Sequence, residues 1–405
     1  MSYYQNLEGC YHYHGQESAI NDLLTSEVLK EFQAAAVKGA FPPVCCVNHP
    51  EEIPLFQQAA ERLAHFEDIL IFGTGGSSLG GKTLYALSSQ EKPRLHFIDN
   101  IDPHTFMLLF QRISIQKTGV LVVSKSGSTV ETLMQMLTLL QHFGPISPSQ
   151  VLVITEPKDN PLRALAEKHH WACLDHPVNV GGRYSCFSVV GLIPLILAGL
   201  DPIVFHKGGQ DVLKDHLNSP HPSAFLGAAM GVYLEKYQHK TLSVMMPYAD
   251  QLNSFSFWYR QLWAESVGKE GKGTTPIQAL GTVDQHSQLQ LYLEGPKDKF
   301  FTLLGVNWEN KGPRIESLDI PEFTGKTMGE LLLAEQKATY QTLLNHNCPT
   351  RLITLDRLDE YHLGALMMHF IIETILAASF LQVNAFDQPA VEEGKKLARE
   401  YLNQK

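Results

Sequence analysis

A run of hydroxyl-bearing residues follows an apolar segment in the first third of this 405-residue chain. The segment 120–123 reads Val-Leu-Val-Val, which is typical of a buried strand in a parallel sheet. The polar groups after it belong to Ser124, Lys125, Ser126 and Thr129. Ser128 precedes Glu131 by three residues, which predicts a capping box and a helix that starts at Thr129. Hydroxyls, an ammonium group and the free N–H groups of a helix start could together bind a dianion such as a phosphate monoester.

Two other interpretations of this run were weighed against the phosphate site. A polar turn that only caps a helix would have the same residues and would need no ligand. A nucleoside triphosphate site is not indicated, because the run lacks the spacing of a Walker loop.

A second loop of similar composition lies earlier in the chain. The apolar run Ile69–Phe72 leads into a loop of glycine and serine, in which Ser77 offers a hydroxyl and the glycines allow a ligand to approach the backbone. Gly73 and Gly75 also begin the pattern of a dinucleotide site, but Ser78 stands where the third glycine belongs. A nicotinamide site is therefore the weaker interpretation.

Apolar strand patterns alternate with helical patterns over most of the chain. The strand candidates are Ile69–Phe72, Leu95–Asp99, Gly119–Ser124, Val151–Thr155, Thr241–Met246, Phe300–Val306 and Arg351–Leu355. This alternation predicts an α/β protein with doubly wound parallel sheets in two successive units. Ligands of such sheets collect at the carboxyl ends of the strands, where both serine-containing loops fall.

The same patterns divide the chain into four expected segments. These are a helical N-terminal arm (1–40), a first α/β domain (41–205), a second α/β domain (206–383) and a C-terminal helix (384–405). A polar stretch with proline and histidine, roughly 201–222, is interpreted as the crossover between the two domains.

The helix predicted over Phe255–Val267 carries a carboxylate on its apolar side. At the helical period, Gln261 and Glu265 share a face with Trp258 and Leu262. An inward carboxylate is costly unless it is paired or kept for proton transfer, so Glu265 is a candidate general base. The structural alternative is an ion pair with Lys269, four residues further on.

Three further side chains could take part in proton or anion chemistry. Arg183 follows two glycines, and its guanidinium could hold a ligand oxygen or pair with a carboxylate. His286 lies among hydrogen-bonding groups and could exchange a proton near neutral pH, although a structural histidine is the more frequent case. The period of the C-terminal helix predicts that Lys395 faces inward, which is rare for a lysine without a function.

Composition argues against several classes of protein. The net charge is −10, from 32 basic and 42 acidic residues, so a general nucleic-acid or membrane surface is not expected. The six cysteines lack CxxC spacing and the N-terminus lacks the order of a signal peptide, which indicates a reduced, cytoplasmic protein. His369 and Glu373 interrupt the apolar segment Leu363–Val383, which favours a core helix over a membrane span. Neither a metal nor a redox cofactor is expected from the motifs.

Five segments together resemble the phosphoglucose isomerase (glucose-6-phosphate isomerase) family. In the order in which the family has them, they are Gly73–Gly80, Ser124–Thr132, Gly181–Ser185, Gln261–Lys269 with Gly281–Gln290, and Asn384–Lys395. The segment Ser124–Thr132 is shared with other sugar-isomerase (SIS) domains, whereas the last two are specific. The resemblance implies two SIS domains, each a parallel sheet between helices. It also implies the interconversion of glucose 6-phosphate and fructose 6-phosphate by ring opening and an enediol, without metal or cofactor.

The resemblance implies a role for each candidate residue. Glu265 matches the base that moves a proton between C1 and C2, and Arg183 matches the residue that stabilises the enediolate. His286 and Lys395 match groups that assist ring opening. The family histidine comes from the neighbouring subunit, so a homodimer with a shared active site is implied. The implied substrate and phosphate contacts are Ser77, Ser124, Lys125, Ser126, Thr129, Gln261 and Gln388.

The chain departs from the family pattern at a few places without losing a catalytic group. It is short for the family, and Ala390 stands where glycine is usual. A side activity on mannose 6-phosphate stays open, because discrimination at C2 depends on the placement of side chains. The alternative from another class is a SIS-type sensor of sugar phosphates. A sensor would need the predicted phosphate contacts at 124–129, here called the phosphate cradle. It would not need Glu265, His286 or Lys395, and all three are present.

Overall fold

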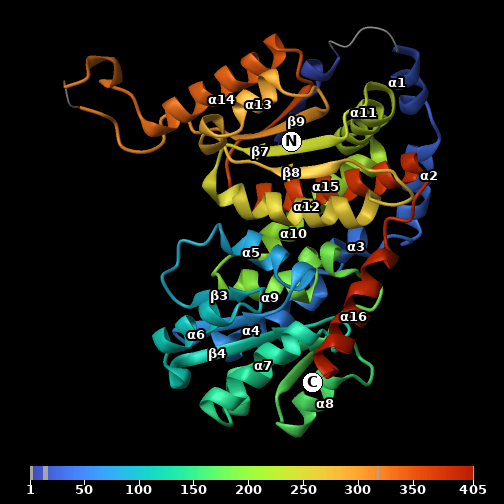
Figure 1. Ribbon diagram of the computed structural model, residues 1–405. Helices are drawn as coiled ribbons and strands as arrows, with labels where there is room; N and C mark the ends of the chain where they lie inside the picture. Colours follow the sequence, from blue (N-terminus) through green and yellow to red (C-terminus); the bar gives the residue numbers. More distant parts are fainter. Residues whose placement is uncertain (1–2, 12–16, 317–318, 405) are drawn as a thin grey trace.

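The computed structural model describes residues 3–11, 17–316 and 319–404. Two five-stranded sheets form its body, with helices between them and on their outer faces (Figure 1). The strand order is β3-β2-β4-β5-β6 in the first sheet and β1-β10-β9-β7-β8 in the second. Every pairing is parallel except that of β1 with β10. The predicted pair of doubly wound parallel sheets is confirmed.

The three central strands of the first sheet, β2, β4 and β5, are buried on both faces. The strands of this sheet are β2 (Asp68–Phe72), β3 (Arg94–Ile98), β4 (Thr118–Val123), β5 (Val151–Thr155) and β6 (Ala172–Asp175). Along β4, Leu121 and Val123 join the central core, while Val120 and Val122 pack with the outer helices. Those outer helices are α6 (Pro103–Arg112), α7 (Val130–Phe143) and α8 (Pro161–Lys168). Burial on both faces explains why the sequences of these central strands are continuous apolar runs.

The second sheet repeats this arrangement with one added edge strand. Its parallel strands are β7 (Leu242–Pro247), β8 (Thr275–Gln278), β9 (Lys299–Val306) and β10 (Thr350–Leu355). The outer face packs against α13 (Leu289–Glu294) and α14 (Met328–Asn345). The helices α11 (Ser223–Gln238), α12 (Asn253–Val267) and α15 (Glu360–Leu381) contribute to the central core on the other side. The short strands β6 and β8 were missed by the sequence analysis because neither is a fully apolar run.

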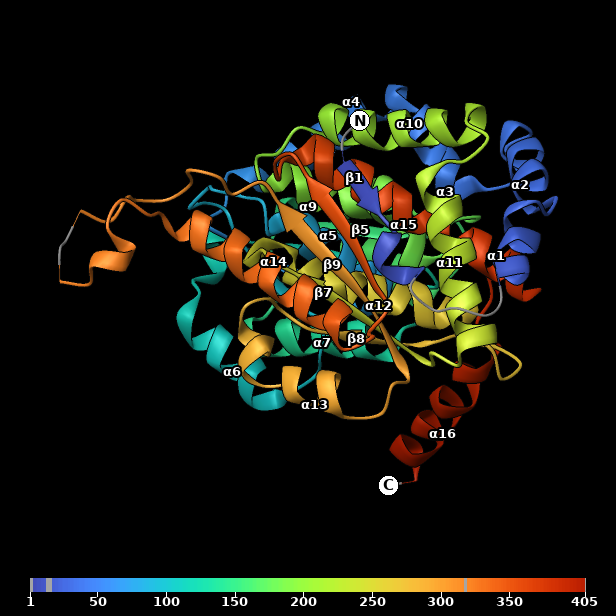
Figure 2. The same ribbon diagram turned by 90° about the horizontal axis from the view of Figure 1, so that it is seen from above.

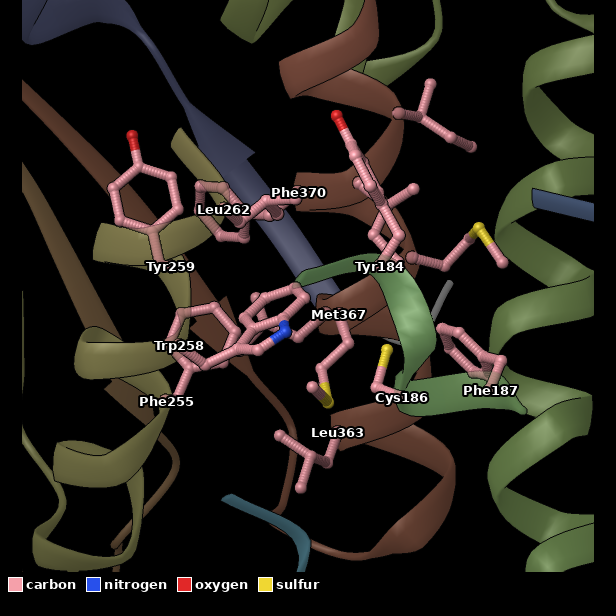
Figure 3. Close-up of a cluster of buried hydrophobic side chains, with 14 of the residues drawn as sticks. Tyr184, Cys186, Phe187, Phe255, Trp258, Tyr259, Leu262, Leu363, Met367 and Phe370 are labelled. Atoms are coloured by element: carbon pink, nitrogen blue, oxygen red, sulfur yellow. The ribbon is translucent and has the colours of Figure 1, made fainter. Parts of the chain in front are cut away.

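Helix α15 is the centre of the molecule. It is the one helix in the described part of the chain that is long and apolar enough to cross a membrane, and 94% of its most apolar window is buried inside the protein. The prediction of a core helix is therefore confirmed. Figure 3 shows Phe370 and Met367 of α15 among the aromatic side chains of α12 and the residues that follow Arg183. This packing buries the side of α12 that carries Trp258 and Leu262.

The N-terminal segment differs from the predicted helical arm. It contains the helices α1 (Glu17–Leu24) and α2 (Val28–Val37), but it begins with the strand β1 (Tyr3–Asn6) at the edge of the second sheet. A buried polar chain anchors this strand: Tyr3 Oη lies 2.7 Å from His369 Nδ1, and His369 Nε2 lies 2.9 Å from Glu373. Glu373 in turn pairs with Arg351 at 2.6 Å. The tertiary network, not local propensity, selects the strand.

The stretch interpreted as a crossover is also different. Residues Pro202–Asn218 form the helix α10, which packs along α15. Two histidines that made this stretch read as polar, His206 and His216, are buried in the core. The domain boundary near residue 205 stays a prediction.

The buried histidines of α10 should make stability depend on pH. Burial lowers the pKa of His206 to about 4 and that of His216 to about 3. The unfolded chain takes up these protons near pH 6.5, whereas the folded protein does not, so stability is lost as the pH falls from about 6.5 towards 4. We expect each histidine to contribute about 1–2 kcal/mol to the loss between pH 7 and pH 5. Urea unfolding at the two pH values measures it. A His216→Gln variant should show a shallower dependence, and an unchanged dependence would contradict this assignment.

Candidate active site

Glycine residues bring two loops into backbone contact, one of which follows strand β2 at the carboxyl end of the first sheet. The loop after β2 contains the turn η4 (Gly75–Ser77), and it faces the start of η7 (Gly182–Phe187). A Cβ atom at Gly76 would lie 2.1 Å from the carbonyl carbon of Gly182, and one at Gly75 would lie 2.8 Å from Gln261 Nε2. Only glycine permits these approaches. Ser77, predicted to contact the sugar, lies half-buried on this turn.

Arg183 is the centre of the site. Its side chain is 2% exposed, and all five N–H groups of its guanidinium are used. Nε donates to Ser266 Oγ at 2.8 Å. Nη1 donates to Glu265 Oε2 at 3.1 Å and to Gln388 Oε1 at 2.6 Å. Nη2 donates to the carbonyl oxygens of Ala385 and Asp387. One side chain thus joins the first half of the chain, helix α12 and the C-terminal segment.

Glu265 lies at the edge of the buried face of α12 and stays partly open to solvent. Its side chain is 29% exposed, and its two oxygens accept hydrogen bonds from different residues. Gln261 Nε2 donates to Oε1 at 2.9 Å, and Arg183 donates to Oε2. Trp258 and Leu262 of the same face are buried, as the helical period predicted. The carboxylate is therefore held in one orientation while part of its surface stays accessible to solvent.

Lys269 does not pair with Glu265, so the structural alternative raised from the sequence is wrong. Its ammonium instead lies 3.0 Å from Asp387 Oδ1 and donates to the carbonyl oxygens of Ser266 and Asn384. The helix ends at Val267 with Gly268 as its C-cap residue, so Lys269 lies outside the helix that carries Glu265. Periodicity could not show this, since it assumes that the helix continues to residue 269.

The residues predicted to bind phosphate lie before helix α7, which starts one residue later than expected. Thr129 is the N-cap residue of α7, and no side chain caps the helix. The Ser128 hydroxyl donates to Ser126 Oγ instead of closing a capping box, so that prediction is wrong. Ser124 donates to Thr129 Oγ1 at 2.9 Å. The first N–H groups of α7 therefore have no side-chain partner, which suits an anion.

Glycine also shapes this turn. Gly127 has a φ of +64°, and a Cβ atom there would lie 1.8 Å from Asn160 Oδ1. Asn160 caps α8 by accepting a hydrogen bond from the Arg163 N–H. The cradle is thus pressed against the start of the neighbouring helix.

Lys125 lies beside the cradle but is engaged with protein groups. Nζ donates to the Val178 carbonyl at 2.7 Å and lies 3.7 Å from Glu156 Oε1. Burial lowers the pKa of the Lys125 ammonium, and the neighbouring Glu156 carboxylate acts in the opposite direction. Glu156, itself buried and also paired with Lys158, was not found by sequence reasoning because it belongs to no motif.

Two predicted residues are not brought to Glu265 by the described chain. His286 is exposed on the turn η9 (Val283–His286), where it lines a pocket of about 670 Å³ with Asp250 and Trp308. Lys395 is exposed on α16 (Glu392–Asn403) and pairs with Glu392 at 2.6 Å.

The prediction that Lys395 faces inward is wrong for this chain. Every residue of α16 whose burial is described is exposed, because the helix projects from the body of the molecule (Figure 2). One hydrogen bond joins it to the cradle, from Arg399 Nη2 to the Ser128 carbonyl at 3.1 Å. The helical period of 3.6 residues shows which side chains of α16 share a face. It does not show whether another part of the protein covers that face.

Comparison with known proteins decides the family. A family model described as phosphoglucose isomerase matches residues 60–295, which is more than half of the chain. The chain belongs to the phosphoglucose isomerase family. The matched range contains Arg183, Glu265 and His286.

Relatives within the phosphoglucose isomerase family extend the match to the C-terminal part. A probable glucose-6-phosphate isomerase of Methanococcus maripaludis is 36% identical over 393 residues, which cover 93% of this chain and 86% of that protein. The glucose-6-phosphate isomerase of Rubrobacter xylanophilus is 38% identical over 353 residues, which cover 82% of this chain and 81% of that protein.

Solved structures show the same fold. A hypothetical protein of Thermus thermophilus matches with a TM-score of 0.88 and 31% identity, over 99% of this chain and all of that one. The glucose-6-phosphate isomerase of Chlamydia trachomatis matches with a TM-score of 0.76 at 23% identity, over 87% and 73% of the two chains. The tagatose-6-phosphate ketose/aldose isomerase of Escherichia coli matches at 0.54 and 13% identity, over 92% and 96%. The predicted SIS-type fold is thereby confirmed.

Within the described part of the chain, no group of three or more histidine, cysteine, aspartate or glutamate side chains could hold a metal ion. The groups that the site offers for chemistry are the carboxylate of Glu265, the guanidinium of Arg183 and the hydroxyls that precede α7.

Proposed function

We propose that this protein interconverts glucose 6-phosphate and fructose 6-phosphate by ring opening and enediol proton transfer between C1 and C2. Membership of the phosphoglucose isomerase family supports the reaction. The observation that carries the proposal is the contact of Glu265 with both Gln261 and Arg183. The start of α7 carries no side-chain cap, and Arg183 is within electrostatic reach of Lys125, which precedes that helix. A base, a cation and a site for the phosphate group are what an aldose–ketose exchange requires.

Glu265 is assigned the proton transfer. Two hydrogen bonds fix its carboxylate, so one oxygen can be directed at C1 and C2 of the open-chain sugar. Gln261 contacts Glu265, and Gln388 contacts Arg183. Both amides are assigned the role of binding the sugar hydroxyls. The phosphate group would lie at the start of α7, among Ser124, Ser126 and Thr129.

Arg183 would act through its charge. Because its five N–H groups already have partners, it has no free donor for the enediolate oxygen. A fixed guanidinium behind the carboxylate still stabilises negative charge that develops nearby, and it needs no reorganisation during the reaction. A direct hydrogen bond to the sugar would require Gln388 to move aside.

His286 and Lys395 are assigned to ring opening, and both need a partner or a movement that the single chain does not provide. His286 is proposed to enter the site of a second subunit, which makes the protein a homodimer with shared active sites. Lys395 would have to leave Glu392 and face the ring oxygen. We further propose a cytoplasmic location, the two-domain division near residue 205 and no nucleic-acid or membrane partner, in keeping with the net charge of −10.

The proposed function is tested by turnover of the purified protein. Fructose 6-phosphate should be converted to glucose 6-phosphate without added metal or nicotinamide, as measured by quenched assays of the product. Mannose 6-phosphate should be tested in the same way as a possible side substrate. A protein that binds fructose 6-phosphate but converts none of it would overturn the enzyme assignment and support a sensor of sugar phosphates.

The shared site can be tested by mixing two inactive variants. Glu265→Gln and His286→Ala each remove one group, and in a mixed dimer one of the two sites regains both. After random exchange of subunits, activity should return to about a quarter of that of the unmodified protein. Mixing Glu265→Gln with Arg183→Lys, two changes on the same side of the site, serves as the control and should restore nothing. No recovery in the first mixture would contradict the shared site.

A further inference from the structure

Side chains from both halves of the chain hold a turn near the C-terminus in place. The turn consists of Asn384–Gln388 and is closed by its own first side chain: Asn384 Oδ1 accepts from the Phe386 N–H, and Asn384 Nδ2 donates to Asp387. Arg183 holds two of its carbonyl oxygens from the first domain. Phe386 packs against Phe41 and Tyr184. The turn delivers Gln388 to the guanidinium.

Lys269, in the loop after α12, also holds this turn in place. Its side chain is 14% exposed, and its ammonium has three oxygen partners. Two of them, Asp387 Oδ1 and the Asn384 carbonyl, belong to the turn, and the third is the Ser266 carbonyl at the end of α12. Ser266 is also the partner of Arg183 Nε and lies 2.8 Å from Tyr184 Oη. Lys269 thus ties the turn to the same end of α12 that carries Glu265.

We infer that Lys269 is a positioning residue for the isomerisation. It touches neither Glu265 nor the phosphate cradle. It fixes the Asn384–Gln388 turn to α12. Gln388 and the guanidinium of Arg183 thereby keep their positions relative to the carboxylate of Glu265. This inference rests on the proposed function for its kinetic part. The holding of the turn by Lys269 can be tested without it.

The kinetic test compares Lys269→Met with Lys269→Arg. Methionine keeps the length of the stem and removes the charge, and we expect kcat/KM for fructose 6-phosphate to fall about 100-fold, the loss that a displacement of about 1 Å at a reacting centre can cause. Arginine keeps the charge and the donors, and it should recover most of this loss. Inhibition by inorganic phosphate, which reports on the cradle, should be unchanged in both. Lys272→Met, in the same loop but paired with the exposed Glu270, is the matched control and should behave as the unmodified protein.

Limited proteolysis tests the turn independently of turnover. Phe386 is a cleavage site for chymotrypsin in this turn, which Arg183 and Lys269 hold in place. Loss of a charged hydrogen bond in Lys269→Met should speed cleavage there about tenfold. Mass spectrometry locates the cut, and Lys272→Met should be cleaved at the original rate.

Two results would overturn the inference. One is a Lys269→Met variant whose kcat/KM and cleavage rate both stay within about twofold of the unmodified protein, which is the small change expected of an ordinary surface substitution. The other is an equal loss of phosphate inhibition and turnover, which would mean general unfolding. If the unmodified protein turned over no sugar phosphate, the proposed function would fail, and cleavage after Phe386 would still decide whether Lys269 holds the turn.

Discussion

Glu265→Gln is expected to lower kcat for fructose 6-phosphate by about 10³- to 10⁴-fold, within the range that general acid–base groups supply. The amide has the shape of the carboxylate and can still accept a hydrogen bond from Arg183, but it cannot take a proton from carbon. The loss should therefore fall on kcat rather than on substrate binding.

Steady-state kinetics with fructose 6-phosphate measure this loss, and isothermal titration with the same sugar shows whether binding is kept. Glu270→Gln is the matched control, since Glu270 is exposed in the next loop and pairs only with Lys272 in the described contacts. A Glu265→Gln variant that kept a tenth or more of the activity, far above the residue's expected contribution, would show that another group is the base.

Arg183→Lys is expected to affect both activity and stability. Lysine keeps the charge, but its three donors cannot replace a planar fork that reaches Ser266, Glu265, Gln388 and two carbonyl oxygens. We expect kcat/KM to fall about 10²- to 10³-fold, as for the loss of an electrostatic group at a transition state. Because buried acceptors lose their donors, the free energy of unfolding should decrease by about 2–3 kcal/mol.

Kinetics and urea unfolding of the same preparation separate the two effects. Arg94→Lys is the control: Arg94 makes a bidentate contact with Asp68 at the opposite end of the first sheet, so its activity should be unchanged. If Arg183→Lys lost stability but kept its kcat/KM, Arg183 would be a structural residue only.

The part of the fold that could be predicted from sequence is the part fixed by local patterns. The strand β4 was predicted because residues buried on both faces of a parallel sheet are continuously apolar. Helix α12 was predicted with Gln261 and Glu265 on one side, and the two side chains are in contact there. Motifs that span a strand and the helix after it, such as the phosphate cradle, fall in this group.

What sequence could not give depends on distant partners. The strand β1 is held by His369 and Glu373, more than 360 residues away in the chain. The alternative that paired Lys269 with Glu265 is wrong because the partner of Lys269, Asp387, lies more than a hundred residues further along the chain. The exposure of Lys395 has the same origin: an amphipathic pattern shows that a face is apolar, not what covers it. In each case the partner is set by the tertiary fold.

The most direct test of the central claim is isotope exchange at the carbon atoms that the enediol joins. Fructose 6-phosphate is brought to equilibrium with the protein in D₂O over many turnovers, and the products are examined by NMR. Proton transfer by a carboxylate that is partly open to solvent predicts deuterium at C2 of glucose 6-phosphate and at one C1 position of fructose 6-phosphate, with none at C3. Full conversion without deuterium at C1 or C2 would mean that hydrogen moves directly between the carbons, and it would contradict the role assigned to Glu265.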